Sequence, residues 1–241
     1  NFPRVYSGIN SESADAIEEF LKTIIDSKNC KLTRLKNTNS TEMAKVLENS
    51  YRAMNISFIV EWSRFAEEAN INLFEVINAI RMRPTHNNIM LPGLGVGGYC
   101  LTKDPIMGSI SASQIYQNNS LEFPISLNSM EINRLMPNNV INLIKNNIKK
   151  QTSNISILVL GLTYREDIDD IRYSPSINLI SKMIANKWSV TAHDPLIEDG
   201  NFPFEFVQKL PSPNKFEFVV LAVPHKFYKN HNWTKWLNEF K

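Results

Sequence analysis

The sequence lacks the features that would suit a membrane, a nucleic-acid surface or a disulfide framework. Its longest apolar runs, 155–162 and 218–223, are far too short to cross a bilayer, and no signal peptide opens the chain. The 26 basic and 24 acidic residues leave a net charge of +2 without a basic run, so we expect no nucleic-acid partner. The only cysteines, Cys30 and Cys100, predict neither a disulfide framework nor a Cys-x-x-Cys metal site, and hence a reducing, cytoplasmic location.

The chain also begins without Met, and its first part is small. We expect strands at 4–9 and 30–35 and a helix at 11–27 that Ser11 or Ser13 could cap. A β-α-β unit of this size cannot bury its own faces. We therefore expect residues 1–36 to be the remnant of a domain whose front is absent, and the chain to be a fragment.

The middle of the chain reads as helical. The strongest helix signal covers 40–70, where Ser40 or Thr41 could cap a stretch without glycine or proline. Apolar side chains repeat there at helical spacing: Met43, Val46, Leu47, Tyr51, Met54, Phe58 and Trp62. Further helices are expected at 72–82, 105–117 and 124–149, with Pro137 starting or kinking one of them. A helix as long as the first is usually a central strut or a dimer seam.

From Ile155 onward, strands alternate with helices. A buried-strand pattern at 155–161 precedes a predicted helix at 175–186, and further strands are expected at 188–192 and 216–222. Such alternation implies a parallel, doubly wound sheet. The predicted fold class is therefore α/β, with a helical central domain at 37–150 followed by a Rossmann-like domain at 151–241.

A glycine-rich segment joins the predicted central helices. Gly93, Gly95 and Gly98 formally match G-x-G-x-x-G, but that motif must follow a strand and open a helix, and here a loop precedes it. The alternative is a backbone that approaches a ligand closely, with Cys100 at the rim. Lys103 is a neighbouring cation, which favours the thiolate form of such a cysteine.

Each of these candidates also has a purely structural interpretation. Cys100 could be a small buried hydrophobe, and Asp104 followed by proline could be an ordinary helix cap. Lys45 and Asn49 are four apart and share one helix face. A lysine there is normally a solvated charge, and an asparagine beside it is usually surface decoration or makes a core hydrogen bond. Spacing alone leaves both interpretations open.

Three ordered blocks favour chemistry. They are 40–56 (STEMAKVLENSYRAMNI), 95–105 (GVGGYCLTKDP) and 160–175 (LGLTYREDIDDIRYSP). Together they resemble the UDP-glucose/GDP-mannose dehydrogenase family over nearly the whole chain. Details such as Leu-Glu-Asn-Ser-Tyr in the first block and Val-Pro-His at 223–225 resemble its UDP-N-acetylmannosamine and UDP-N-acetylglucosamine dehydrogenases.

The resemblance implies two NAD-dependent oxidations that convert a sugar C6 alcohol into a carboxylate, supplying uronic acids for a polysaccharide. Cys100 is then the nucleophile that forms a thiohemiacetal and a thioester. Lys45 and Asn49 match the pair that stabilises oxyanion charge, and Asp104 matches the carboxylate that positions water.

The resemblance also assigns binding residues. Residues expected to bind substrate are Gly95, Gly97, Gly98, Tyr99, Arg83, His86, Tyr164 and Arg165. Among these, Tyr164 and Arg165 stand where the family usually has Phe and Lys beside the diphosphate, and Arg83 and His86 would reach a neighbouring subunit's substrate. Lys103 and Arg172 are expected on the cofactor side, and a homodimer is expected through the long helix.

The family's full NAD-binding domain is not in this sequence. A catalytically incomplete UDP-sugar-binding and dimerisation module is therefore the alternative function. An acyl-transfer cysteine enzyme is disfavoured, because the four histidines are scattered and form no recognisable partner motif.

Overall fold

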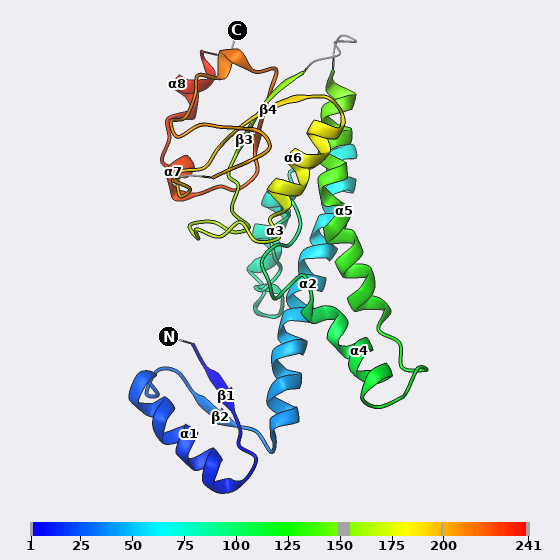
Figure 1. Cartoon of the computed structure of the whole chain (residues 1–241), viewed down its shortest axis with the longest axis vertical. Coiled ribbons are helices and arrows are strands. Elements are labelled where there is room, and N and C mark those ends of the chain that lie inside the picture. Colours follow the sequence, from blue (N-terminus) through cyan, green and yellow to red (C-terminus); the bar gives the residue numbers. More distant parts are fainter. Residues whose placement is uncertain (1, 149–154, 199, 240–241) are drawn as a thin grey trace.

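The computed structural model describes residues 2–148, 155–198 and 200–239. Figure 1 shows three parts along one long axis: a small unit at the N-terminal end, a pair of long helices, and an α/β domain at the other end. The predicted domain limit at 150/151 and the predicted helix end at 149 lie outside the described residues.

The N-terminal unit is the β-α-β element that the sequence predicts. Strands β1 (Arg4–Tyr6) and β2 (Leu32–Arg34) pair in parallel, and helix α1 (Ser11–Ile24) connects them. The cap of α1 is Asn10 and not a serine, which corrects that prediction. The Asn10 side chain accepts a hydrogen bond from the Ser13 N–H, and the Ser13 hydroxyl accepts one from the Asn10 N–H.

The helical region is built on α2 (Thr38–Glu68) and α5 (Pro124–Asn147), which pack along each other. Asn37 caps α2 by accepting from the Ser40 N–H, so the serine is the donor and not the predicted cap. Helix α3 (Leu73–Arg81) confirms the predicted 72–82 helix to within a residue. The predicted 105–117 helix consists of a 3-10 turn, Asp104–Ile106, followed by α4 (Met107–Gln114).

Helix α5 continues through Pro137 and does not start there. Proline has no N–H, so the carbonyl of Asn133, four residues earlier, receives no hydrogen bond from it within the helix. The glycine-rich loop lies against this same carbonyl, since a Cβ on Gly95 would come within 2.4 Å of the Asn133 oxygen. Gly95 also has a φ of +109°, a conformation that favours glycine. The proline and the glycine thus meet at one contact between loop and helix.

The C-terminal domain contains the predicted parallel sheet. Strands β3 (Ser156–Leu160), β4 (Ser189–His193), β5 (Glu205–Phe206) and β6 (Phe218–Leu221) pair in the order β5-β4-β3-β6, all parallel. The two-residue edge strand β5 was not expected from the sequence.

Helices cover both faces of this sheet. Ile157 and Val159 of β3 pack into the core under α6 (Pro175–Ala185), whereas the alternate residues Leu158 and Leu160 pack against Tyr228 and Trp236. Those two aromatic residues come from the short helices α7 (Lys226–Lys229) and α8 (Trp233–Leu237). This alternation along one strand confirms the doubly wound arrangement.

In the described ranges, no helix combines the length and apolarity that a membrane crossing requires.

Candidate active site around Cys100 and Asp104

Asp104 is the buried centre of a polar cluster between α2 and the glycine-rich loop. The residue is 5% exposed, and its carboxylate accepts a hydrogen bond from the Asn49 amide at 2.5 Å. The Lys103 ammonium donates to the other oxygen at 2.9 Å, and the Lys45 ammonium lies 3.9 Å from the first. The structure therefore brings the predicted residues Lys45, Asn49 and Asp104 together.

Local backbone geometry places Cys100 beside this cluster. The N–H groups of Lys103 and Asp104 both donate to the Cys100 carbonyl, at 3.1 and 2.9 Å, so a single tight turn joins the cysteine to the carboxylate. The Asp104 side chain makes no capping hydrogen bond, because Lys103 occupies the cap position of the 3-10 turn. The interpretation of Asp104 as an ordinary helix cap is therefore wrong.

The electrostatics of the cluster favour an ionised carboxylate. Burial alone would raise the pKa of Asp104, but the hydrogen bonds from Lys103 and Asn49 outweigh burial and lower this pKa below its usual value. The hydrogen bond to Asp104 in turn raises the pKa of Lys103. Near neutral pH the site thus holds a carboxylate and ammonium groups at close range.

The two cysteines have opposite surroundings. Cys30 is 6% exposed in the N-terminal unit, whereas Cys100 is exposed. The pKa of Lys103 is raised chiefly by Asp104 and that of Arg172 chiefly by Asp170, and Cys100 adds a smaller contribution to each. Both cations are therefore within electrostatic reach of the thiol, and the interpretation of Cys100 as a buried hydrophobe is wrong.

The glycines of the loop allow close approach to the protein's own atoms. A Cβ on Gly97 would lie 2.7 Å from the Tyr164 Cβ and 2.8 Å from Pro175, and one on Gly98 would meet the Tyr164 ring. The Gly98 N–H donates to the Arg172 carbonyl at 3.0 Å, and the Tyr99 ring lies 6.2 Å from the Tyr173 ring. The second and third blocks of the sequence thus form one surface, with Tyr99 exposed on it.

The predicted diphosphate residues lie in the loop that follows β3. Tyr164 is half-buried against the glycines, and Arg165 is exposed. Among the described residues, the Arg165 guanidinium has no hydrogen bond or ion pair, so its charge is uncommitted. Arg172, by contrast, holds Asp170 through a fork of hydrogen bonds at 2.7 to 3.1 Å.

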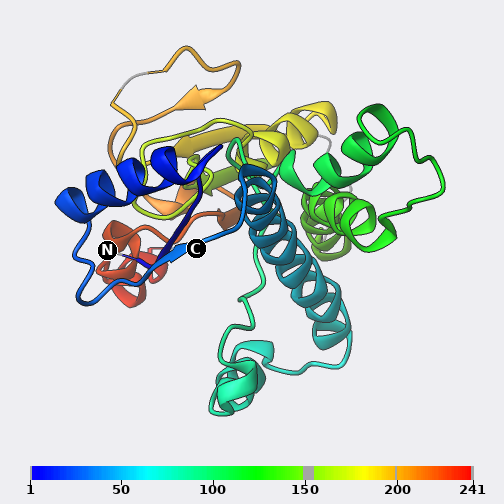
Figure 2. The same cartoon turned by 90° about the horizontal axis from the view of Figure 1, so that it is seen from below.

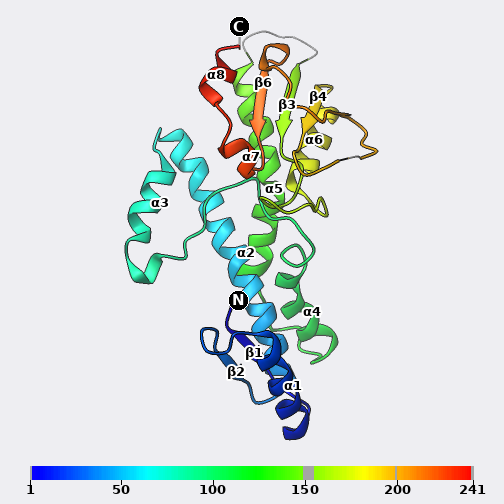
Figure 3. The ribbon, with the colours of Figure 1, turned by 90° about the vertical axis from the view of Figure 1, so that its left-hand side faces the viewer.

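Arg83 and His86 lie outside this cluster. Both are exposed next to or within the 3-10 turn Pro84–His86 that follows α3. Figure 3 shows that α3 stands off to one side of α2. The structure shows no hydrogen bond or ion pair between these two described residues and the Cys100–Asp104 cluster, and their predicted reach into a second subunit stays a prediction.

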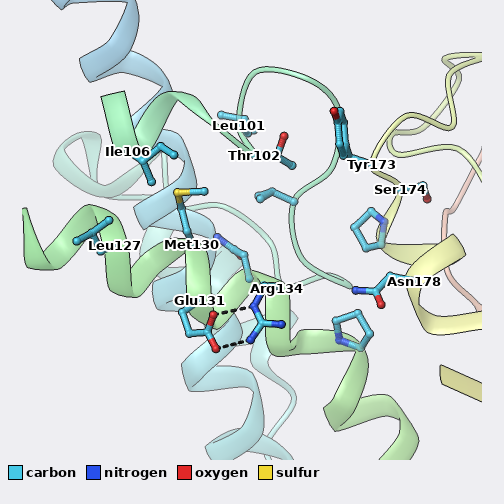
Figure 4. A pocket seen from close by; sticks show the side chains of 14 residues that line it. Leu101, Thr102, Ile106, Leu127, Met130, Glu131, Arg134, Tyr173, Ser174 and Asn178 are labelled. Carbon is cyan, nitrogen blue, oxygen red and sulfur yellow. Dashed lines mark hydrogen bonds and ion pairs between the residues drawn. The ribbon is translucent and has the colours of Figure 1, made fainter. Parts of the chain in front are cut away.

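A cavity of about 490 Å³ adjoins the glycine-rich loop and was not predicted from the sequence. Figure 4 shows it between the loop, α5 and the segment that leads into α6, with the Glu131–Arg134 ion pair on one wall. Its other wall residues are Val96, Leu101, Thr102, Ile106, Leu127, Met130, Asn133, Pro137, Tyr173, Ser174, Pro175 and Asn178. Among the residues that the structure describes, the buried side-chain oxygen of Asn133 has no hydrogen-bond partner. The accessible wall of the cavity is mainly apolar.

A second buried polar group, at the carboxyl edge of the C-terminal sheet, was also missed. Asp194 directly follows β4, and His225 follows β6 after three residues. They meet over the end of β3, where His225 Nε2 lies 3.2 Å from an Asp194 oxygen. The signal was present in the sequence as polar residues just after two predicted strands.

Sequence profiles of one family match most of the chain. The central domain of the UDP-glucose/GDP-mannose dehydrogenase family matches residues 39–134, and the UDP-binding domain of that family matches residues 158–241.

Individual relatives agree with these profiles. The UDP-N-acetyl-D-mannosamine dehydrogenase of Methanocaldococcus jannaschii is 31% identical over 94% of this chain. That of Campylobacter jejuni is 33% identical over 91% of this chain. In both comparisons the match covers 49% of the relative. The structure of UDP-D-ManNAc dehydrogenase from Pyrococcus horikoshii matches with a TM-score of 0.76 at 27% identity, over 100% of this chain and 54% of that one. Cap5O from Staphylococcus aureus, a UDP-N-acetyl-mannosamine dehydrogenase, also gives a TM-score of 0.76, at 26% identity over 99% and 52% of the two chains.

The chain spans about half the length of these relatives. Within that span both domain profiles occur in order, on the fold of the solved dehydrogenases. The chain belongs to the UDP-glucose/GDP-mannose dehydrogenase family.

Proposed function

We propose that this chain acts in the NAD-dependent oxidation of the C6 alcohol of a UDP-N-acetylhexosamine to the uronic acid. The observation that carries the proposal is the exposed Cys100, held by one turn beside the buried Asp104 with Asn49 and Lys45 at its carboxylate. A nucleophile, a hydrogen-bond donor, a cation and a carboxylate at one place are the groups that thiol-dependent oxidation of an aldehyde requires.

The chemistry assigned to Cys100 begins with the aldehyde, the product of the first oxidation. The sulfur adds to the aldehyde carbon and forms a thiohemiacetal, and loss of a hydride from that carbon leaves a thioester. Water then cleaves the carbon–sulfur bond and releases the carboxylic acid and the thiol. Lys45 and Asn49 stabilise the negative oxygen in the addition and hydrolysis steps, and Asp104 orients water or accepts its proton.

NAD would supply the oxidising chemistry of this scheme as a hydride acceptor, with one NAD molecule consumed in each of the two oxidations. Lys103 and Arg172 fit an anionic cofactor next to the thiol, because both are cations within electrostatic reach of Cys100. Each already has a carboxylate partner, Asp104 and Asp170 respectively. Their predicted role is to present positive charge on that side of Cys100.

The substrate class is supported by the relatives and by the loop after β3. The relatives named above are dehydrogenases of UDP-N-acetyl-D-mannosamine, and the C-terminal profile is a UDP-binding domain. The uncommitted guanidinium of Arg165 next to Tyr164 offers a charge and a ring to a nucleoside diphosphate. We favour a UDP-N-acetylhexosamine over UDP-glucose on these grounds.

A homodimer through α2 is part of the proposal. Met43, Leu47, Tyr51, Phe58, Trp62 and Phe65 recur at helical spacing along this helix, and their exposed fractions range from 46% to 70%. The stripe therefore does not contribute to the core of this chain, although its periodicity is that of a buried face. Figure 2, which looks along the long axis, shows α2 projecting to one side of the C-terminal domain. A second copy of α2 would cover these side chains.

Protection of the thiol by substrate tests the proposed function. The purified chain is treated with iodoacetamide, and labelling at each cysteine is followed by mass spectrometry, with and without UDP-N-acetylmannosamine or UDP-N-acetylglucosamine. Burial alone predicts that Cys100 reacts faster than Cys30, so the decisive result is slower labelling of Cys100 with a UDP-sugar present. Cys100→Ser gives the background at Cys30.

The alternatives predict different results in the same experiment. A UDP-sugar that binds, as measured by calorimetry, but leaves Cys100 labelling unchanged would favour a UDP-sugar-binding module in which the thiol takes no part. Absence of both binding and protection would overturn the proposal.

A further inference from the structure

Three consecutive strands of the C-terminal sheet bring polar residues to one point. Because β4, β3 and β6 are parallel neighbours, their carboxyl ends meet at the same edge of the sheet. Asp194 follows β4 and is 1% exposed, and His225 comes after β6 and is 0% exposed. Both side chains lie over the loop after β3 and contact Thr163, which is 31 residues from Asp194 and 62 residues from His225.

Asp194 fixes the start of that loop. One carboxylate oxygen accepts hydrogen bonds from the N–H groups of Leu162, at 2.6 Å, and Thr163, at 3.2 Å. The other accepts from the Leu196 N–H at 2.9 Å. Burial would raise the pKa of Asp194, but hydrogen bonds from His225, Leu162 and Leu196 outweigh burial and lower it. The buried carboxylate is thus ionised and fully used as an acceptor.

His225 fixes the end of the loop, and its partners determine its tautomer. The Asp167 N–H, which can only donate, lies 2.9 Å from His225 Nδ1, so Nδ1 accepts. The proton of the neutral ring is then on Nε2, which faces Asp194 at 3.2 Å and the Thr163 hydroxyl at 3.1 Å. Asp167 has a φ of +55°, which is uncommon for a residue other than glycine. Its carboxylate accepts from the Lys226 N–H at 3.0 Å, so it is held on two sides.

The residues between these fixed points are the ones expected to bind the substrate. Thr163 donates its hydroxyl proton to the Arg165 carbonyl at 2.9 Å, and the Tyr164 N–H donates to the Asp170 carbonyl at 2.9 Å. The loop 163–167 is therefore held at both ends and in the middle, while the side chain of Arg165 is exposed.

We propose that Asp194 and His225 are positioning residues that hold the loop 163–167 so that Tyr164 and Arg165 are preorganised for the diphosphate of the nucleotide sugar. This inference rests on the proposed function for the identity of the ligand. Neither residue contacts the exposed surface, so both act through the loop. A preorganised loop binds more tightly because less ordering is left for the binding step.

The arrangement also requires a neutral His225 ring. A proton on Nδ1 would face the donating N–H of Asp167, and that hydrogen bond would be lost. Two carboxylates face the ring: Asp194 at the end of β4, and Asp167 on the loop, whose carboxylate is 3.7 Å from Nδ1. The Lys226 ammonium lies 3.8 Å from the Asp167 carboxylate. Tyr228 and His193 are the other titratable groups nearby. The neutral tautomer with its proton on Nε2 therefore satisfies Asp167, Asp194 and Thr163 together.

Matched substitutions of His225 test the proposal. His225→Asn places an amide oxygen near Nδ1 and can still accept from Asp167, whereas His225→Phe keeps a ring without any acceptor. We expect His225→Phe to weaken UDP-N-acetylglucosamine binding about tenfold by calorimetry, and His225→Asn to recover most of that loss. Wild-type affinity in His225→Phe, with the same thermal unfolding temperature, would overturn the proposal.

A further measurement separates positioning from loss of fold. Amide hydrogen exchange should show the Asp167 amide protected in the wild type and in His225→Asn but fast in His225→Phe, and equal protection in all three would also overturn the proposal.

These outcomes are distinguishable from failure of the proposed function. If the wild-type chain does not bind a UDP-sugar, the proposed function fails, and the exchange of the Asp167 amide still decides whether His225 holds the loop. If the wild type binds and its Cys100 is protected, a His225→Phe variant that binds equally well removes the positioning role alone.

Discussion

The Asn49 side-chain amide donates a 2.5 Å hydrogen bond to the carboxylate of Asp104, 55 residues later in the chain. Both residues are at most 5% exposed, so this bond joins α2 to the turn that carries Cys100 in the buried part of the site. The strength of such a bond depends on charge as well as geometry, because an ionised acceptor makes the stronger interaction. Placing the carboxylate at position 49 and the amide at position 104 therefore tests whether the pair needs one donor and one ionised acceptor, whichever position carries the charge.

An Asn49→Asp substitution should destabilise the chain, because it places a second carboxylate against Asp104. Two carboxylates in contact cannot both remain ionised, and the pKa of one is raised. We expect a loss of about 1–3 kcal/mol of unfolding free energy at neutral pH, measured by urea denaturation. The double variant Asn49→Asp/Asp104→Asn restores one donor and one acceptor and should recover most of the loss. A double variant no more stable than the single one would show that the pair is not coupled.

Gly97→Ala should disrupt the contact between the glycine-rich loop and the segment 164–175. The added methyl would lie 2.7 to 2.8 Å from Tyr164, Tyr173 and Pro175, including a backbone oxygen, so the loop must shift. We expect a loss of about 1–3 kcal/mol in unfolding free energy and weaker UDP-sugar binding.

Gly93→Ala is the matched control for this substitution, since a Cβ there would meet nothing within 4 Å. It should be nearly neutral in both measurements. Equal effects of the two substitutions would mean that the loop responds to any loss of glycine and not to the contact with Tyr164.

The sequence predicted the elements of this chain better than their connections. Hydrophobic periodicity located α2, α3, α5 and the parallel sheet, because periodicity depends only on local spacing. The caps were misassigned, since asparagines one to three residues before the serines, Asn10 and Asn37, supply the accepting oxygens. The strand β5 was not predicted, because two residues are too few to show the alternation of buried and exposed side chains that identifies a strand.

The residues of the candidate site could likewise be named from the sequence, but their contacts could not. Lys45, Asn49 and Asp104 were named from the resemblance of three blocks, and the structure brings them together. The pairing of Asp194 with His225 could not be read from spacing, since it depends on strand order in the sheet. Asn49 illustrates the same limit, because spacing along α2 leaves a surface amide and a core hydrogen bond both open, and its partner Asp104 lies 55 residues away.

The stability of the chain should fall with acidification in two separate ranges. Burial lowers the pKa of His193 in the folded chain, while the unfolded chain keeps a value of about 6.5. Below that pH the unfolded state binds a proton that the folded state does not, so stability decreases as the pH falls through this range. The lowered pKa of Asp194 has its effect at lower pH: its contribution is present above about pH 3.9 and is lost as the pH falls through the folded value.

Comparison of the wild type with His193→Phe isolates the first range. Urea denaturation at several pH values should give a wild-type slope up to about 1.4 kcal/mol per pH unit steeper than that of the variant below pH 6.5. Above that pH the two curves should run parallel. Equal slopes throughout would mean that His193 takes up a proton in the fold as readily as in the unfolded chain.

Trp62→Glu should separate the proposed dimer into monomers. Trp62 lies in the exposed apolar stripe of α2 with Phe58 and Phe65, whose rings pack against it at 6.2 and 5.8 Å, so a carboxylate there would be buried without a partner in a second copy. Light scattering after gel filtration should give about twice 27.7 kDa for the wild type and 27.7 kDa for Trp62→Glu.

Arg64→Glu is the matched control, because it places the same group on an exposed part of α2 outside the stripe and should leave the mass unchanged. Because the stripe is already solvent-exposed in the single chain, thermal unfolding of Trp62→Glu monomers should match that of wild-type chains diluted until they dissociate. A wild type that is monomeric at all concentrations would remove α2 as the dimer interface of this chain.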